Sequence, residues 1–202
     1  MPHNLEPLFA AAIETLSEAR VDYLVYGGIA AGLWGEPRYT EDIDIVIFVP
    51  EREFHRFLRA AARHGFHVDE DLNIQQLQVS GWTRIPLGRR DSPLHTDVTL
   101  GDSPFDRSAF ERRRTATIFG REVPVASPED LVLYKMISAF TNPERTRDLA
   151  DVEAVFRRMG SSLDAGHLRK WATFWEGEGI QGMVARVEEL VAKWGGRAKP
   201  AL

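Results

Sequence analysis

The sequence predicts an α+β fold, in which a small mixed β-sheet with flanking helices over residues 1–126 is followed by a helical region over residues 127–202. Strand-like and helix-like segments are interspersed in the first part, whereas only helical patterns occur in the second. The sequence has no Pro/Gly/Ser-rich linker or internal repeat between the parts. We therefore expect the helical region to pack on the core and to close a shared cleft.

The spacing of apolar residues and the position of turn residues define the elements. In chain order, we expect a helix over residues 4–19, a strand over 21–27, a short helix over 29–34, a strand over 41–49, a helix over 51–65, strands over 82–88 and 95–100, a short helix over 105–113, a hairpin over 115–126 and helices over 127–140, 146–159, 163–175 and 182–194. Residues 66–100 are otherwise less regular. Ser127 is the expected N-cap of the helix that opens the second part.

Composition excludes several kinds of chemistry. Hydrophobic residues make up 44% of the chain and charged residues 27%, as in globular proteins, and the formal net charge of -5 argues against coating nucleic acid through bulk charge. The absence of cysteine excludes disulfides, thiolate metal sites and a cysteine nucleophile. Because the sequence has neither a long apolar run nor a secretion signal, we expect a cytoplasmic protein without a membrane partner.

Two aspartates share one face of a predicted strand. Residues two apart on a strand point to the same side, so Asp42 and Asp44 face one way while isoleucines face the other. Two ionised carboxylates at this spacing repel each other, and a divalent cation between them would relieve the repulsion. Mg²⁺ suits such an oxygen site, and it fills its remaining positions with water and phosphates.

A phosphate cradle and a third acid complete the predicted site. Gly27 and Gly28 follow a strand and open a helix, where backbone N–H groups can approach a phosphate. Asp97 is an isolated acid in the later strand-like HTDVTL, and it would allow a two-metal site. Each feature alone also has an ordinary explanation, because strand-end acids often face solvent and Gly-Gly turns are common. Their order and combination favour the site.

The residues that form this pattern resemble a known superfamily. The stretch YGGIAAGLWGEPRYTEDIDIVIF, with the later HTDVTL, resembles the nucleotidyltransferases that include DNA polymerase beta, and among them the minimal bacterial AbiEii-like toxin branch. Arg38 and Thr40 look like part of the family's Arg-x-Ser/Thr-x-Asp-x-Asp segment. The helices SPEDLVLYKMISAF and RTRDLADVEAV are similar to its lysine helix and Arg-Asp-x-x-Asp helix, so the resemblance covers residues 20–157. Gly28 departs from the Gly-Ser of many relatives, which removes a hydroxyl from the cradle.

The resemblance implies a nucleotidyltransferase fold and an enzyme that moves a nucleoside monophosphate from an NTP such as ATP to an acceptor hydroxyl, with pyrophosphate leaving. Its implied cofactors are two Mg²⁺ ions, with Mn²⁺ as an alternative. The implied roles are metal binding by Asp42, Asp44 and Asp97, triphosphate binding by Gly27, Gly28, Arg38, Thr40 and Lys135, and a catalytic contribution from Asp148. A catalytically silent binding partner of the same fold, such as an antitoxin or regulatory module, is the alternative function.

Two charged positions in the helical region have competing explanations. Lys135 interrupts the apolar helix LVLYKMISAF, where a buried ammonium needs a partner or must reach the surface. Asp148 and Asp151 share a helix face, with Arg147 placed to pair with Asp151. The helix dipole favours acids in the first turn of a helix. This explanation of Asp148 fits the sequence as well as a catalytic role does.

The acceptor and partners stay open on sequence alone. An RNA such as tRNA would suit a basic groove, which Arg89, Arg90 and the run at 112–114 offer, while a small molecule or a protein hydroxyl would need only a pocket. The toxin branch implies a cognate antitoxin or toxin partner. A dinucleotide-binding site is excluded because the glycine spacing does not fit and the Asp-x-Asp strand arrives too early.

Overall fold

A computed structural model describes residues 5–196, which form two compact units. The α/β unit comprises the described residues up to Ile29 together with Tyr39–Val125. The helical unit comprises Ala30–Arg38 and the described chain from Ala126 onward. The division into domains 1–126 and 127–202 stays a prediction, and the segment Ala30–Arg38 shows that the chain enters the helical unit twice.

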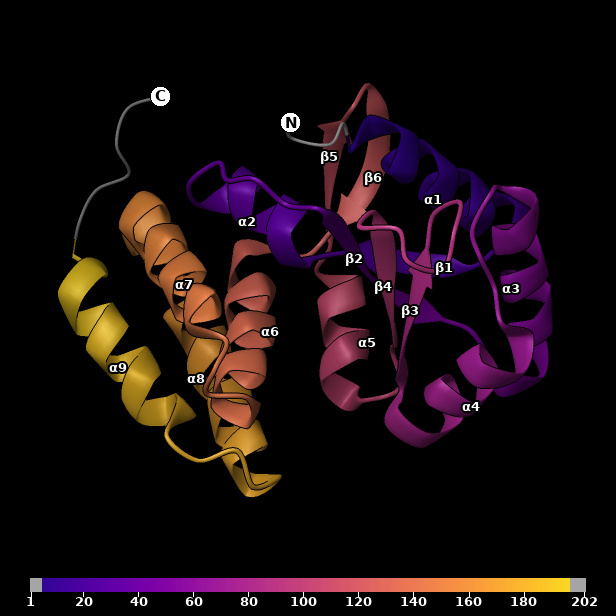
Figure 1. Cartoon of the computed structure of the whole chain (residues 1–202). Coiled ribbons are helices and arrows are strands. Elements are labelled where there is room, and N and C mark those ends of the chain that lie inside the picture. Colours follow the sequence, from indigo (N-terminus) through magenta and orange to yellow (C-terminus); the bar gives the residue numbers. More distant parts are fainter. Residues whose placement is uncertain (1–4, 197–202) are drawn as a thin grey trace. The chain divides into compact units, whose positions relative to one another are not determined.

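The α/β unit is built on a mixed six-stranded sheet with the order β3-β4-β2-β1-β6-β5 (Figure 1). Its strands are β1 (Asp22–Val25), β2 (Asp42–Phe48), β3 (Trp82–Pro86), β4 (His95–Leu100), β5 (Arg114–Ile118) and β6 (Arg121–Val125). The pairs β2–β4 and β1–β6 are parallel, and the other neighbours are antiparallel. The predicted mixed sheet with flanking helices is thereby confirmed.

Burial explains the alternation along β2. Ile43, Ile45 and Ile47 are almost fully buried on one face of the strand. On that side of the sheet, α1 (Glu6–Ala19) and α3 (Phe54–Arg63) lie next to each other, and their Ala12 and Phe57 line a small apolar cavity with Ile45 (Figure 1). Removing this apolar surface from water fixes which face of β2 points inward. The aspartates of the strand consequently lie on the opposite face.

The other helices of this region are α2 (Gly27–Trp34), α4 (Glu70–Ser80) and α5 (Pro104–Glu111), with the 3₁₀ turn η1 (Glu51–Glu53) before α3. Helix α2 begins two residues earlier than the predicted start at residue 29. No helix is predicted from the sequence over residues 70–80, because α4 lacks a continuous apolar stripe. Within it Leu77 is buried but Val79 is exposed, and the buried Asn73 side-chain amide donates to Thr83 Oγ1 at 2.8 Å to anchor the helix on β3.

The helical unit contains the four predicted long helices. They are α6 (Pro128–Thr141), α7 (Thr146–Met159), α8 (Ala165–Gly177) and α9 (Met183–Trp194), with the turn η2 (Gly160–Ser162) after α7. Ser127 Oγ accepts the backbone N–H of Asp130 at 3.1 Å, so the predicted N-cap is confirmed. Trp34 Nε1 donates to the Ala126 carbonyl at 2.8 Å and ties the segment Ala30–Arg38 to this unit. No described helix is long and apolar enough to cross a bilayer.

Candidate functional site

The parallel pairing of β2 and β4 assembles four ionisable side chains on one face of the sheet. The register places Asp42 beside His95 and Asp44 beside Asp97. Since residues two apart on a strand share a face, the two ionisable residues of β2 point to the same side, and so do the two of β4. Asp97, the predicted third acid of the site, therefore lies beside the first pair of acids.

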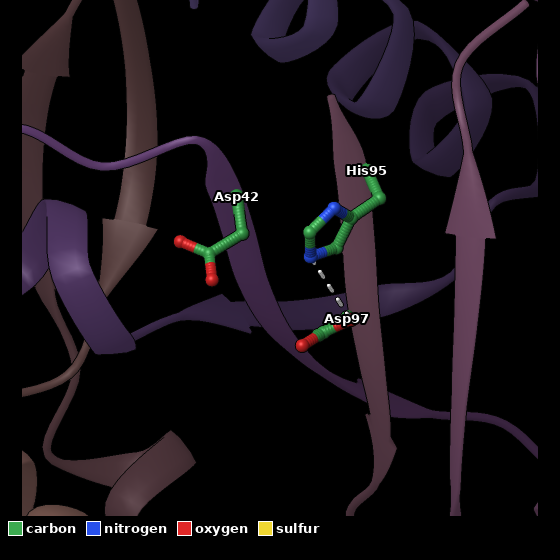
Figure 2. Close-up of side chains that lie close together, drawn as sticks. All are labelled: Asp42, His95 and Asp97. Carbon is green, nitrogen blue, oxygen red and sulfur yellow. Dashed lines mark ion pairs between the residues drawn. The ribbon is translucent and has the colours of Figure 1, made fainter. Parts of the chain in front are cut away.

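Three of these side chains converge closely. One ligand atom each from Asp42, His95 and Asp97 lies within 4.8 Å of the other two, a spacing at which all three can bind one cation (Figure 2). Thr40 Oγ1 donates a short hydrogen bond to Asp42 Oδ1 and holds this carboxylate from the preceding loop. Among the described residues, this is the cluster whose donor atoms fit a divalent metal.

The His95 ring contributes a nitrogen to the cluster. Its Nδ1 lies 2.9 Å from the Pro93 carbonyl oxygen, and because a carbonyl only accepts, Nδ1 carries the proton. In the neutral ring the lone pair is then on Nε2, which is buried and has no hydrogen-bond partner among the described residues. Figure 2 shows Nε2 directed toward Asp97, whose Oδ1 is 3.8 Å away, beyond hydrogen-bond distance.

Arg84 on β3 holds Asp97 with a two-point contact. Its Nε and Nη2 donate to the two carboxylate oxygens at 2.8 and 2.9 Å. Hydrogen bonding to Asp97, with added attraction from Asp42 and Asp44, raises the pKa of Arg84 above its ordinary value. The guanidinium therefore fixes the orientation of Asp97 and offsets part of the negative charge of the three aspartates.

Asp44 packs against the glycine turn that opens α2. Its Oδ2 accepts the Gly28 backbone N–H at 3.2 Å, as is favourable for a carboxylate at a helix N-terminus. Gly27 has φ +60°, and a Cβ at this position would lie only 1.7 Å from Asp44 Oδ2. The glycine turn thus lies in direct contact with the acidic strand, and glycine is required for that approach.

The helical unit contains a separate cluster of charges around Lys135. This lysine is buried on α6, and its Nζ contacts Asp148 Oδ1 at 2.6 Å and Asp151 Oδ2 at 3.1 Å. Ser138 Oγ donates to Asp148 Oδ2 at 2.8 Å, and Arg145 Nε forms an ion pair with the same oxygen at 2.9 Å. The ammonium is thus paired rather than extended to the surface, which is the condition for burying it.

Arg38 belongs to the same charge cluster. Its guanidinium donates to both carboxylate oxygens of Asp151 at 3.0 Å each. The prediction that Arg147 pairs with Asp151 is wrong, because Arg38 and Lys135 occupy both oxygens of that carboxylate. Arg38 is distant in sequence from α7, so spacing along one helix could not reveal this pair.

The environment of Asp148 affects its ionisation in opposing ways. Burial, the largest influence, raises the pKa of Asp148, whereas the charge and hydrogen bond of Lys135 lower it. Ser138 and Arg145 lower it further, and the net result is a pKa below the ordinary value. Asp148 is therefore held as a carboxylate within the cluster.

The model of one protein family, the nucleotidyl transferase AbiEii toxin of type IV toxin–antitoxin systems, matches residues 12–188 of the chain. The chain belongs to the AbiEii family. Membership makes this protein a nucleotidyltransferase and places it in a toxin–antitoxin family. Among curated protein sequences, none matches this chain significantly.

Solved structures share the fold of this AbiEii-family chain. The antibiotic-resistance factor ANT(2'')-Ia has a TM-score of 0.58 in its solution structure at 15% identity, with 96% of each chain covered. Its crystal structure in complex with adenylyl-2''-tobramycin gives a TM-score of 0.53 at 14% identity, covering 91% of this chain and 97% of the other. A Helicobacter pylori protein assigned as a nucleotidyltransferase gives 0.52 at 17% identity, covering 95% and 90%. At these identities the likeness establishes the nucleotidyltransferase fold.

Sequence reasoning missed two members of the candidate site. His95 stands two residues before Asp97, so the period-two rule that paired Asp42 with Asp44 also places it on the same face. This local signal was available. Arg84 gave no such signal, because its contact with Asp97 depends on the register between β3 and β4.

Proposed function

We propose that the chain transfers a nucleoside monophosphate from an NTP to an acceptor hydroxyl in a reaction that depends on a divalent cation, with Mg²⁺ as the first candidate and Mn²⁺ as the second. The observation that carries the proposal is the convergence of Asp42, His95 and Asp97 beside a glycine turn in a chain of the AbiEii family. In the reaction, the acceptor oxygen bonds to the α-phosphorus and the bond to the β-phosphate breaks. Pyrophosphate leaves with that electron pair, and the hydroxyl proton passes to Asp97.

The side chains divide this work by their chemistry. Asp42 and Asp97, with Asp44 beside them, would hold the cation, which when bound supplies positive charge to the phosphates. Gly27 and Gly28 would hold the triphosphate close to the backbone, with Thr40 orienting Asp42. For Lys135 and Arg38 we propose phosphate binding, and for Asp148 a catalytic role, on the strength of the family resemblance. In the structure both cations pair with carboxylates of α7.

The acceptor and the partner belong to the proposal as well. The family's place in type IV toxin–antitoxin systems supports a cognate antitoxin for this chain. An RNA such as tRNA is the first acceptor to test, followed by proteins and small molecules. One experiment covers these classes: the full chain is incubated with each α-labelled NTP, Mg²⁺ or Mn²⁺ and a cell extract, and the label is sought in RNA, protein and small-molecule fractions.

Two variants make that experiment specific. Asp42→Asn removes a charged ligand of the proposed cation and should abolish labelling, whereas Asp91→Asn changes an acid whose side chain is 75% exposed and should leave it intact. NTP binding without any turnover would instead favour the catalytically silent alternative, which is supported by the hold of Arg84 on both Asp97 oxygens. Absence of both binding and turnover with every metal and acceptor would contradict the proposed function.

A further inference from the structure

We propose that His95 Nε2 is a direct ligand of the cation held by Asp42 and Asp97, and that this nitrogen makes the site prefer Mn²⁺ to Mg²⁺. The inference rests on the proposed function, because it refines the metal site described there.

The backbone places this atom at the metal cluster. His95 is the register partner of Asp42 and stands on the same strand face as Asp97. Its Nε2 therefore faces two carboxylates that come from two neighbouring strands (Figure 2). A nitrogen and two oxygens within 4.8 Å of one another can occupy neighbouring positions around one ion.

The other side of the ring is fixed as in many metal-binding histidines. A ligating imidazole usually donates its second N–H to a backbone carbonyl or carboxylate, which sets the tautomer and the ring orientation. In this chain the contact of Nδ1 with the Pro93 carbonyl at 2.9 Å does both. It leaves the Nε2 lone pair directed into the cluster.

A purely structural role leaves Nε2 unexplained. The atom is buried without a hydrogen-bond partner among the described residues, and 3.8 Å to Asp97 is too long for a hydrogen bond. Buried polar atoms are nearly always paired, because leaving one unpaired is unfavourable. Coordination of a cation would satisfy Nε2 and would at the same time neutralise the neighbouring carboxylates.

The donor set determines which cation is preferred. Mg²⁺ favours oxygen ligands and gives up water reluctantly, whereas imidazole is a good ligand for transition metals. Mn²⁺ suits carboxylate ligands as Mg²⁺ does, and as a first-row transition metal it also binds nitrogen donors. The two carboxylates with one imidazole should therefore bind Mn²⁺ more tightly than Mg²⁺.

The test detects the nitrogen without relying on enzyme activity. The full chain is stripped of metal and titrated with Mn²⁺ alone, and electron spin echo envelope modulation of the bound ion is recorded. We expect the modulation of a coordinated imidazole ¹⁴N in the wild type and in His67→Ala, a variant of an exposed histidine outside the site. The modulation should be absent in His95→Gln, with Mn²⁺ affinity reduced about tenfold or more and Mg²⁺ affinity reduced less.

Three other outcomes would overturn the role of His95 or the proposed metal site. Binding of Mn²⁺ that is lost in Asp42→Asn but shows no ¹⁴N modulation would overturn the role of His95 and leave the proposed metal site intact. An unchanged modulation in His95→Gln would also overturn it. If neither Mn²⁺ nor Mg²⁺ bound the wild type, this inference and the metal dependence of the proposed function would fail together.

Discussion

At Gly27 the backbone conformation and the neighbouring carboxylate both require the absence of a side chain. The residue has φ +60°, and an added Cβ would meet Asp44 Oδ2 at 1.7 Å. The backbone at this position and the place of the Asp44 carboxylate therefore depend on each other. A residue-scale change here should affect both stability and the acidic face of β2.

We predict that Gly27→Ala lowers the free energy of unfolding more than Gly88→Ala does. Gly88 also has positive φ, +81°, but an added Cβ there meets nothing within 4 Å. The control should lose about 1 kcal/mol from backbone strain alone. Gly27→Ala should lose on the order of 1–3 kcal/mol more through the collision. Urea unfolding measures the difference, and equal losses in the two variants would show that Asp44 does not constrain Gly27.

The pairing of Arg84 with Asp97 should contribute to the stability of the folded chain. Arg84→Ala leaves Asp97 without its two-point partner, close to two other aspartates, so stability at neutral pH should fall. Because the Arg84 side chain is half exposed, solvent screens the pair and we expect a loss of only roughly 1 kcal/mol. Thermal unfolding at low salt is the measurement.

The control for Arg84 is Arg89→Ala. Arg89 pairs with Asp91, and both side chains are 75% exposed, so their pairing should contribute little. A saturating divalent cation should reduce the Arg84→Ala deficit, since the cation supplies the missing positive charge. A deficit equal to that of Arg89→Ala would mean that Arg84 does not offset the acidic cluster.

At the scale of elements, α6 and α7 are joined by the buried contact between Lys135 and Asp148. Asp148→Asn removes a carboxylate from this contact, while Lys135 keeps Asp151. We expect a loss of about 2–3 kcal/mol at neutral pH, less than for a buried cation with no remaining partner. Glu144→Gln, an exposed change between the two helices, should have little effect.

The same pair predicts how stability changes with pH. The pKa of Asp148 is lower in the folded chain than its ordinary value of 3.8, so the folded state favours the carboxylate. Its contribution is complete above that ordinary value and disappears as the pH falls through the lower folded pKa. The stability deficit of Asp148→Asn should therefore shrink below about pH 4. A deficit that stays constant between pH 7 and pH 3 would contradict this assignment.

Elements differed in how far the sequence could define them. The strand β2 and the helices α1 and α3 were predictable because burial imposes a clear period on their residues. Helix α4 was not, since it is anchored by the polar contact of Asn73 with Thr83 rather than by an apolar stripe. Helix starts were accurate where a capping residue such as Ser127 marked them.

For the whole molecule, local spacing predicted part of the candidate site and tertiary pairing supplied the rest. Asp42 and Asp44 follow from the period of one strand, and the fold follows from the order of elements. The pairings of Arg84 with Asp97 and of Arg38 with Asp151 join segments distant in the chain. No periodicity within one element encodes such contacts, because they depend on strand register and on packing between elements.

The chain as a whole is an AbiEii-family nucleotidyltransferase. We propose that its aspartate face performs the transfer with a divalent cation. The most direct measurement is the rate of pyrophosphate release from an NTP in the presence of Mg²⁺ or Mn²⁺ and a cell extract that supplies the acceptor. Asp42→Asn should slow this release at least about a hundredfold, because loss of a metal ligand removes several kcal/mol of transition-state stabilisation. Asp91→Asn should match the wild type. Release that is unaffected by Asp42→Asn, in a variant that remains folded, would show that the aspartate face does not perform the transfer.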